Sequence, residues 1–417
     1  MSISEDRPRA GLSAASASGA AARAEAGPSD SRLLRIRVAL FLAGFATFSL
    51  IYCTQPILPE LSQAFSVSPA ASSLALSMTT GALAIAILCA GAISESFGRR
   101  GLMFVSMIAA AVLNLAAAVT VEWHLLLAVR TLEGLVLGGV PAVAMAYLAE
   151  EMPKARLGAA MGLYVGGTAL GGMSGRVLIG ILTEHSDWRM ALGAMAVLDL
   201  LIAIAFVFLL PASRNFVRRP GLGLGFHLTA WGAHLRHPAL PLLFATGFLS
   251  MGAFVTVYNY AGFRLIAPPY DLDQSQIGLI FLAYLFGMVA SPTAGYLADR
   301  FGRAGVVALG AIGMLAGLVI TLTAPLAVII VGVVLLTIGF FTVHAVASGW
   351  VGRLAEANKS HAASLYLLAY YAGSSIMGSM GGWFWHADGW PGVVAFSGVM
   401  TALILAIAGW LALSRRG

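Results

Sequence analysis

The stretch that decides the fold occurs twice. Residues 91–101 read GAISESFGRRG, and residues 295–305 read GYLADRFGRAG. Both copies keep the same glycines, phenylalanine and arginine, and each lies between two long apolar runs. Glycine permits a sharp turn and a close approach of two helices, and basic residues hold a loop at the cytoplasmic membrane surface. Each copy therefore predicts a tight, charged hairpin between two membrane helices.

A second pair of segments repeats at nearly the same separation. Residues 163–164 read Leu-Tyr and precede Gly171, and residues 365–366 read Leu-Tyr and precede Gly373. Two matching regions in one register indicate that the chain is duplicated. Two membrane halves built on one plan are typical of transporters.

Composition excludes an ordinary soluble protein. The chain of 417 residues is 59% hydrophobic and only 10% charged, whereas soluble domains carry about 25% charged residues. Apolar runs near the ~20 residues that span a bilayer occur at 37–58, 70–92, 101–120, 124–147, 158–183, 189–211, 239–265, 275–297, 304–323, 326–350, 362–384 and 391–413. We therefore predict an all-α membrane protein with twelve transmembrane helices in two pseudo-symmetric six-helix halves.

The same pattern divides the chain into parts. In order, these are a disordered cytoplasmic tail (1–36), an N-terminal half (37–211), a cytoplasmic linker (212–238), a C-terminal half (239–413) and a cytoplasmic tail (414–417). The first tail is rich in Ala, Ser and Gly and too polar to fold alone. Around Phe226 to Leu235 the linker is either an amphipathic helix at the membrane interface or a solvated basic loop.

Basic residues gather in alternate loops. The chain has 24 Lys and Arg residues, and the loops of the opposite set hold only Arg189 and Arg264. Because cytoplasmic loops carry the excess of Lys and Arg, this pattern predicts that both termini are cytoplasmic. The basic residues are dispersed over loops rather than gathered on one domain, which argues against a nucleic-acid partner.

The doubled hairpin resembles the loop motif of the major facilitator superfamily, which stands between its second and third helices and again between its eighth and ninth. The second copy fits the motif, whereas the first departs from it at Glu95 and Ser96. The candidate gating-loop residues are Gly91, Glu95, Gly98, Arg99, Arg100, Gly295, Asp299, Arg300, Gly302 and Arg303. The resemblance implies that Glu95 and Asp299 lie near the N-termini of spans eleven and five, where a helix dipole favours an acid.

Four shorter segments resemble the acriflavin-sensitivity, YnfM-like family of bacterial inner-membrane transport proteins. They are residues 52–59 (YCTQPILP), 171–176 (GGMSGR), 344–348 (HAVAS) and 364–366 (SLY). The resemblance implies a secondary active transporter of the inner membrane that exports a small organic molecule or drug by proton antiport. A proton-coupled importer or uniporter of a sugar or organic acid is the alternative. A non-transporting membrane sensor ranks third, because the tail and the linker are too short to bury a core.

Ionisable side chains within the spans mark candidate functions, because a charge at membrane depth is costly. Arg130 and Glu133 lie three residues apart on one helical face, so Glu133 either takes up the coupling proton or forms a permanent ion pair. His344 is the second proton-coupling candidate. Asp199 is the third, since the sixth helix lies outside the transport path in the superfamily. Arg176 either binds an anionic group or pairs with Glu133.

Polar and aromatic side chains near the middle of the spans predict the substrate cavity. The candidates are Gln55, Arg130, Arg176, Tyr258, Asn259, Tyr366 and Tyr370. Tyr366 and Tyr370 share a helical face, and such rings suit planar or amphipathic molecules. Packing between the halves is the other interpretation of these tyrosines.

Nothing in the sequence favours an enzyme. The chain has no phosphate-binding loop of the Gly-x4-Gly-Lys-Ser/Thr type, so ATP is not the expected energy source. No metal-ligand cluster accompanies His344, and we expect neither a metal nor a cofactor. The expected partners are a small-molecule substrate, protons and the lipid bilayer, and the resemblance implies a monomer.

Overall fold

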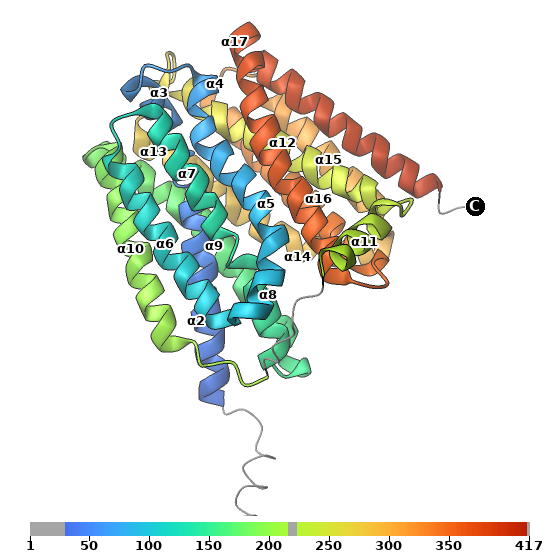
Figure 1. The fold of residues 1–417 in the computed structure, drawn as a ribbon. Helices are drawn as coiled ribbons and strands as arrows, with labels where there is room; N and C mark the ends of the chain where they lie inside the picture. The colour runs from blue at the N-terminus through green and yellow to red at the C-terminus, as the bar shows by residue number, and fades with distance from the viewer. Residues whose placement is uncertain (1–29, 216–222, 415–417) are drawn as a thin grey trace, which may run out of the picture.

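The computed structural model describes residues 30–215 and 223–414, and for the helical residues 91–97, 142 and 224 it describes the backbone alone. Within these ranges the chain is all-helical, without a β-strand (Figure 1). Long helices follow from the apolar runs, because in a bilayer every backbone N–H and C=O must be paired within the segment. Of the disordered tail predicted at 1–36, residues 1–29 lie outside the described residues, whereas residues 30–36 belong to a helix that begins at Asp30.

The N-terminal half runs from the blue to the green helices of Figure 1. Its helices are α2 (Asp30–Tyr52), α3 (Leu58–Ala64), α4 (Pro69–Ser72), α5 (Leu74–Phe97), α6 (Arg99–Val119), α7 (Trp123–Leu137), α8 (Pro141–Glu151), α9 (Lys154–His185) and α10 (Trp188–Leu209). The start of α10 is capped by the Asp187 carboxylate, which accepts from two backbone N–H groups.

The linker helix and the C-terminal half follow. They comprise α11 (Leu224–Leu235), α12 (Leu240–Ile266), α13 (Gln274–Leu279), the 3-10 helix η1 (Ile280–Ala283), α14 (Tyr284–Phe301), α15 (Arg303–Ile320), α16 (Leu326–Leu354) and α17 (Lys359–Leu413). A capping box between Asp273 and Gln276 begins α13.

Ten helices of the described chain are long and apolar enough to cross a membrane. The predicted fourth span is divided, because α7 ends at Leu137 and α8 begins at Pro141, and proline cannot donate the N–H that would continue a helix. The last two predicted spans lie within α17, whose two arms in Figure 1 meet at the non-helical residues Asp388 and Gly389. The all-helical fold is confirmed, and the count of twelve spans stays a prediction.

The two hairpins that opened the sequence adopt the same backbone conformation. Gly98 has φ 88° and ψ 143°, and Gly302 has φ 88° and ψ 142°. This is a region that residues with a β-carbon rarely occupy. A β-carbon would meet no atom within 4 Å at either position. Backbone conformation rather than space therefore requires these glycines.

The second repeat is a pair of matching helix crossings. In the N-terminal half, a β-carbon on Gly171 of α9 would lie 2.1 Å from the carbonyl oxygen of Phe45 on α2. In the C-terminal half, a β-carbon on Gly373 of α17 would lie 2.1 Å from the carbonyl oxygen of Phe248 on α12. Glycine permits both approaches. The duplication predicted from the sequence thus extends to the way each half packs.

The halves meet toward one end of the bundle. We call the end with α3 and α4 the far face, and the end with α8 and α11 the linker face (Figure 1). A β-carbon on Gly180 of α9 would lie 2.8 Å from the Cα atom of Gly278 on α13. Ser375 on α17 donates to the carbonyl oxygen of Ser77 on α5 at 2.7 Å. Backbones of the two halves therefore approach closely on the far-face side of the middle.

The linker helix α11 packs against α12 and α17. Trp231 Nε1 donates to Ser364 Oγ at 3.4 Å, and the rings of His227 and His361 stack at 5.2 Å. Of the two interpretations of this segment, the structure contains the helix. It is fastened to the C-terminal half rather than free in solvent.

Candidate functional site

Three buried polar side chains form a chain across the interface between the halves. Arg176 Nε on α9 donates to Gln55 Oε1 at 2.7 Å, and Gln55 Nε2 donates to Asn259 Oδ1 on α12 at 2.8 Å. Arg176 also donates to the carbonyl oxygen of Gly172. The side chains of Gln55, Arg176 and Asn259 are 2%, 1% and 1% exposed. Three of the predicted cavity residues are therefore in contact.

The central hydrogen bond joins equivalent positions of the duplicated chain. Gln55 and Asn259 are 204 positions apart, the separation of the glycines that begin the two hairpins at 91 and 295. Gln55 follows the end of α2 at Tyr52 and precedes Pro56, so the chain leaves the helix there. Transporters built from repeats place their substrate sites at the interface between the repeats.

Aromatic rings from both halves surround the Arg176 guanidinium. Its Cζ atom lies 4.1 Å from the ring centre of Tyr52, 5.0 Å from that of Phe281 and 4.9 Å from that of Tyr284. A cation is attracted to such ring faces. The sequence interpretation missed these rings, although Tyr52 lies three residues before Gln55 in the same motif.

Arg176 has no carboxylate within 4.0 Å in the part of the chain that the structure describes. The pairing of Arg176 with Glu133, which the sequence left open, is wrong, because Glu133 is bound to Arg130 instead. A fully buried guanidinium without an anionic partner is costly. Arg176 therefore needs compensation from neutral acceptors and rings, or from a ligand.

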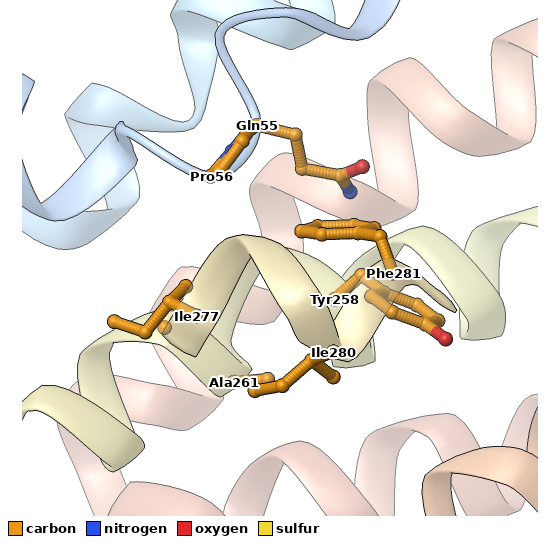
Figure 2. A pocket seen from close by; sticks show the side chains of 8 residues that line it. Gln55, Pro56, Tyr258, Ala261, Ile277, Ile280 and Phe281 are labelled. Atoms are coloured by element: carbon orange, nitrogen blue, oxygen red, sulfur yellow. The ribbon is translucent and has the colours of Figure 1, made fainter. Parts of the chain in front are cut away.

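A small cavity lies beside this polar chain (Figure 2). Gln55 and Pro56 line it from the N-terminal half, and Tyr258, Ile277 and Phe281 line it from the C-terminal half. Its volume is about 10 Å³, which is room for a single water molecule. In this structure the site is therefore closed on its own side chains.

A further contact closes the far face. The backbone N–H of Gln274 donates to Glu184 Oε2 at 2.9 Å, and its Nε2 donates to Glu60 Oε1 at 3.0 Å. Two glutamates of the N-terminal half thus hold the first residue of α13. Hydrogen bonds to carboxylates are stronger than those between neutral groups. This contact could not be predicted from the sequence, since it joins three separate segments.

Arg130 and Glu133 form an ion pair inside the N-terminal half. Nη1 of Arg130 donates to Glu133 Oε2 at 2.6 Å, and both side chains are 0% exposed. Further bonds from Arg130 run to the carbonyl oxygens of Leu50, Ile51 and Ala75 at 3.3, 3.1 and 3.2 Å. Arg130 therefore binds α2 and α5 to α7 and does not line the interface between the halves.

Asp199 lies on the other side of α2 from Arg176. Both of its carboxylate oxygens lie 3.1 Å from Ser49 Oγ, and the side chain is 1% exposed. A β-carbon on Gly175, the neighbour of Arg176, would lie 2.8 Å from the Cα atom of Ser49. One residue of α2 thus separates Asp199 from the helix turn that carries Arg176.

His344 belongs to an aromatic cluster of the C-terminal half. Its Nδ1 lies 2.9 Å from the hydroxyl of Tyr366, and its ring centre lies 4.6 Å from that of Tyr370. The ring of Phe340 stacks on His344 at 6.0 Å. The structure thus brings His344 together with two predicted cavity residues. Among the described residues, no group of three or more His, Cys, Asp or Glu could hold a metal ion.

The predicted gating loops form ion pairs within each half. Asp299 Oδ1 accepts from Arg303 at 2.9 Å and from Arg353 at 3.0 Å. In the first loop, Arg99 binds Glu150 at 2.6 Å. For Gly91 and Glu95 the structure describes the backbone alone, so the predicted position of the Glu95 carboxylate stays a prediction. In this structure Asp299 is therefore held by α15 and α16 of its own half.

Glu151, which the sequence interpretation missed, fastens the start of the linker. Its Oε1 accepts from Ser213 Oγ at 2.6 Å and from the backbone N–H of Arg214 at 2.6 Å, and its Oε2 accepts from Arg32 at 2.7 Å. Burial works to raise the pKa of this carboxyl, but these bonds and one from the Asn215 N–H hold the pKa below its usual value. Glu151 is thus a stable anion at the linker face.

The fold and the site define an integral membrane transporter: apolar helices in two related halves with a polar site at their interface. The model of the Major Facilitator Superfamily matches residues 40–269 and 249–417. The chain belongs to this superfamily, whose members are transporters and not enzymes.

Relatives and solved structures agree with this assignment. The chain is 45% identical to "Inner membrane transport protein YnfM" of Escherichia coli, over 90% of each chain. It is 44% identical to "Uncharacterized MFS-type transporter YybF" of Bacillus subtilis, over 91% of this chain and 94% of that one. The nucleoside transporter NupG has the same fold, with a TM-score of 0.74 at 12% identity over 89% of this chain and 99% of that one.

Proposed function

We propose that this chain is a secondary active transporter that moves a small organic molecule by alternating access and is driven by the proton gradient. The observation that carries the proposal is the hydrogen-bonded chain from Arg176 through Gln55 to Asn259, which crosses between the halves. A site built from both halves can be exposed first to one side and then to the other. The Gln274 contacts close the far face in this arrangement.

Two directions of transport are compatible with this mechanism. The motifs shared with the acriflavin-sensitivity family favour export by proton antiport. The alternative is an importer or uniporter of a sugar or organic acid, and the buried charge of Arg176 supports an organic acid among these substrates. A non-transporting sensor would show no flux.

Flux in proteoliposomes under an imposed pH gradient tests the proposal. Acriflavine, aromatic antimicrobials, arabinose and aromatic acids form the panel, and collapse of the gradient by an ionophore is the control. An exporter by antiport and an importer by symport respond oppositely to the same gradient. If no compound moves in response to any gradient, the proposed function is wrong.

We further propose a monomer in the bacterial inner membrane with both termini and the linker face in the cytoplasm. The excess of Lys and Arg in the loops at that face supports this orientation. Labelling of single cysteines by an impermeant reagent in intact cells tests it, with one cysteine at Asp271 near the far face and one at Ser414. Labelling of Ser414→Cys but not of Asp271→Cys would contradict the orientation.

A further inference from the structure

We infer that the transported substrate is an organic anion with an aromatic or apolar body, that its acid group binds Arg176, and that one proton is taken up with it on the carboxylate of Asp199. The inference rests on the proposed function and adds the substrate class, the coupling residue and the mode of coupling: because anion and proton bind together, it selects symport over antiport. It follows from the buried charges and their positions.

The substrate class follows from the surroundings of Arg176. The guanidinium is 1% exposed, its oxygen partners are the neutral Gln55 amide and the Gly172 carbonyl, and the rings of Tyr52 and Tyr284 cover it. The Gln55 amide oxygen occupies the place that a carboxylate oxygen of the substrate would take. An anion adds Coulombic attraction in a low-dielectric site and can accept two parallel hydrogen bonds from the guanidinium, so it displaces the neutral Gln55 amide favourably. The rings then contact the body of the substrate.

Displacement of Gln55 also explains how binding of the substrate would change the contact between the halves. Gln55 is the only link through which Arg176 reaches Asn259 in this chain of hydrogen bonds. An anion that replaces the Gln55 oxygen releases the bond between the equivalent positions of the two halves. The cavity beside Gln55, of about 10 Å³, is too small for such a substrate. The halves must therefore move as it binds.

The proton follows from the balance of buried charge. Arg130, Glu133, Arg176 and Asp199, all at most 1% exposed, are two cations and two carboxyl groups, so this part of the protein is neutral when both carboxyl groups are ionised and no anion is bound. An anion on Arg176 would leave one negative charge in excess. Uptake of one proton from the aqueous side by a carboxylate restores neutrality, and its release on the opposite side resets the site. Burial of an uncompensated charge is unfavourable, so anion and proton bind together.

Asp199 is the better acceptor of that proton. Glu133 receives a bond from Arg130 at 2.6 Å, whereas Asp199 has only the neutral hydroxyl of Ser49. The other groups near this cluster are neutral: Cys53 on α2 and Asn114 on α6, both of which face Arg130. Only Ser49 lies between Asp199 and the turn of α9 that carries Arg176. Asp199 is therefore linked to that turn of α9 through the packing of Gly175 on Ser49.

Ligand-induced thermal stabilisation of the purified protein tests the substrate class. The probes are benzoate, cinnamate and benzenesulfonate, each beside its neutral amide, with benzyltrimethylammonium as the cation. The anions should bind, and Arg176→Gln should weaken them by about a hundredfold, whereas Arg176→Lys should retain part of the affinity. The Gln variant should fold, since a neutral amide can still donate to Gln55 and costs less to bury than a guanidinium. Binding of the amides or the cation alone, binding of no anion, or equal anion binding by Arg176→Gln would overturn the inference.

The pH dependence of anion affinity tests the coupling residue. We consider the pH range in which Asp199 is ionised in the protein without bound anion. Over this range the affinity of the wild type for the anion should fall by about tenfold per pH unit as pH rises, because one proton enters with the anion. Asp199→Asn should bind the anion without this pH dependence and should exchange it across liposomes without proton-driven accumulation. Asp271→Asn, which removes an exposed carboxylate, is the matched control and should behave as wild type. A pH-independent wild type, or an unchanged slope in Asp199→Asn, would refute the assignment.

These results separate the inference from the proposed function. Gradient-driven flux of neutral or cationic compounds alone would leave the proposed function standing and refute the anion. Anion binding that depends on Arg176, without flux of any compound, would support the site and refute the transport proposal.

Discussion

Replacement of Arg130 by methionine should destabilise the protein strongly, and a second replacement of Glu133 by leucine should restore most of the loss. The single variant leaves the Glu133 carboxylate buried at 0% exposure without its 2.6 Å partner. Breaking a buried pair in this way costs about 3–5 kcal/mol, whereas replacing both members by apolar groups of similar volume is often neutral. We therefore expect about 3–5 kcal/mol for Arg130→Met and about 2 kcal/mol for the double variant, which restores the charge balance but not the hydrogen bonds to the backbone.

The loss should fall toward the upper end of that range because Arg130 does more than neutralise Glu133. It also donates to three backbone carbonyls of α2 and α5, and the double variant does not restore these bonds. The Ala75 carbonyl keeps its partner within α5, whereas Leu50 and Ile51 lie in the last turn of α2, where the helix supplies no backbone donor. We expect the lost bonds together to contribute about 2 kcal/mol.

Equilibrium unfolding in mixed micelles measures the free energies, with Glu133→Leu completing the double-mutant cycle. Flux under a pH gradient is measured on the same proteins. The double variant removes one cation and one anion, so the balance between Arg176 and Asp199 is unchanged and gradient-driven transport should survive. An Arg130→Met variant within about 1 kcal/mol of wild type would refute the view of Arg130 as a packing ion pair. If a stable double variant no longer couples transport to the proton gradient, Glu133 rather than Asp199 is the coupling residue.

Three further changes test the repeat and the linker, each by melting temperature. Gly171→Ala should destabilise the protein by about 1–3 kcal/mol, because its β-carbon would lie 2.1 Å from a backbone oxygen. Gly166→Ala is the control, since its β-carbon would meet nothing within 4 Å. Equal melting temperatures of the two variants would contradict the close crossing of α9 and α2. Gly98→Ala should destabilise the protein by about 1–2 kcal/mol, because Gly98 has φ 88°, and Gly101→Ala serves as its control. An unchanged melting temperature of Gly98→Ala would contradict the hairpin geometry shared with Gly302. Because the folded-state pKa of Glu151 lies below its ordinary 4.5, its stabilisation is present above that pH and lost as pH falls through the folded value. Glu151→Gln should remove this part of the acid sensitivity, and an unaltered acid transition would show that Glu151 contributes nothing to it.

The duplicated fold could be predicted from the sequence because its signals are local. A backbone with φ 88° and a close helix crossing both require glycine, so the glycines recur at fixed separation in both halves. The length of an apolar run likewise depends on bilayer thickness alone. Gln55, Arg176 and Asn259 were identified as cavity residues because polar groups at membrane depth are few.

Contacts between distant helices could not be predicted in the same way. Hydropathy gives the length of a span but not its rotation about its own axis, which decides whether Tyr284 covers Arg176 or faces lipid. The Gln274 contacts depend on three segments meeting at the far face. For the same reason the sequence could not decide whether Glu133 pairs with Arg130 or with Arg176, since both lie at similar depth.

The chemical difference between the halves carries the strongest argument about mechanism. The register that aligns Gly171 with Gly373 aligns Arg176 with Gly378, whose carbonyl oxygen accepts from the hydroxyl of Tyr260 at 3.3 Å. The backbone plan is thus shared, but the buried charges of the candidate site belong to the N-terminal half, and the C-terminal half contributes Asn259 and aromatic rings. A proton or an anion therefore changes the charge of one half only. Since Gln55 and Asn259 meet at equivalent positions, a charge change beside Gln55 acts directly on the bond between the halves, where a small displacement separates them.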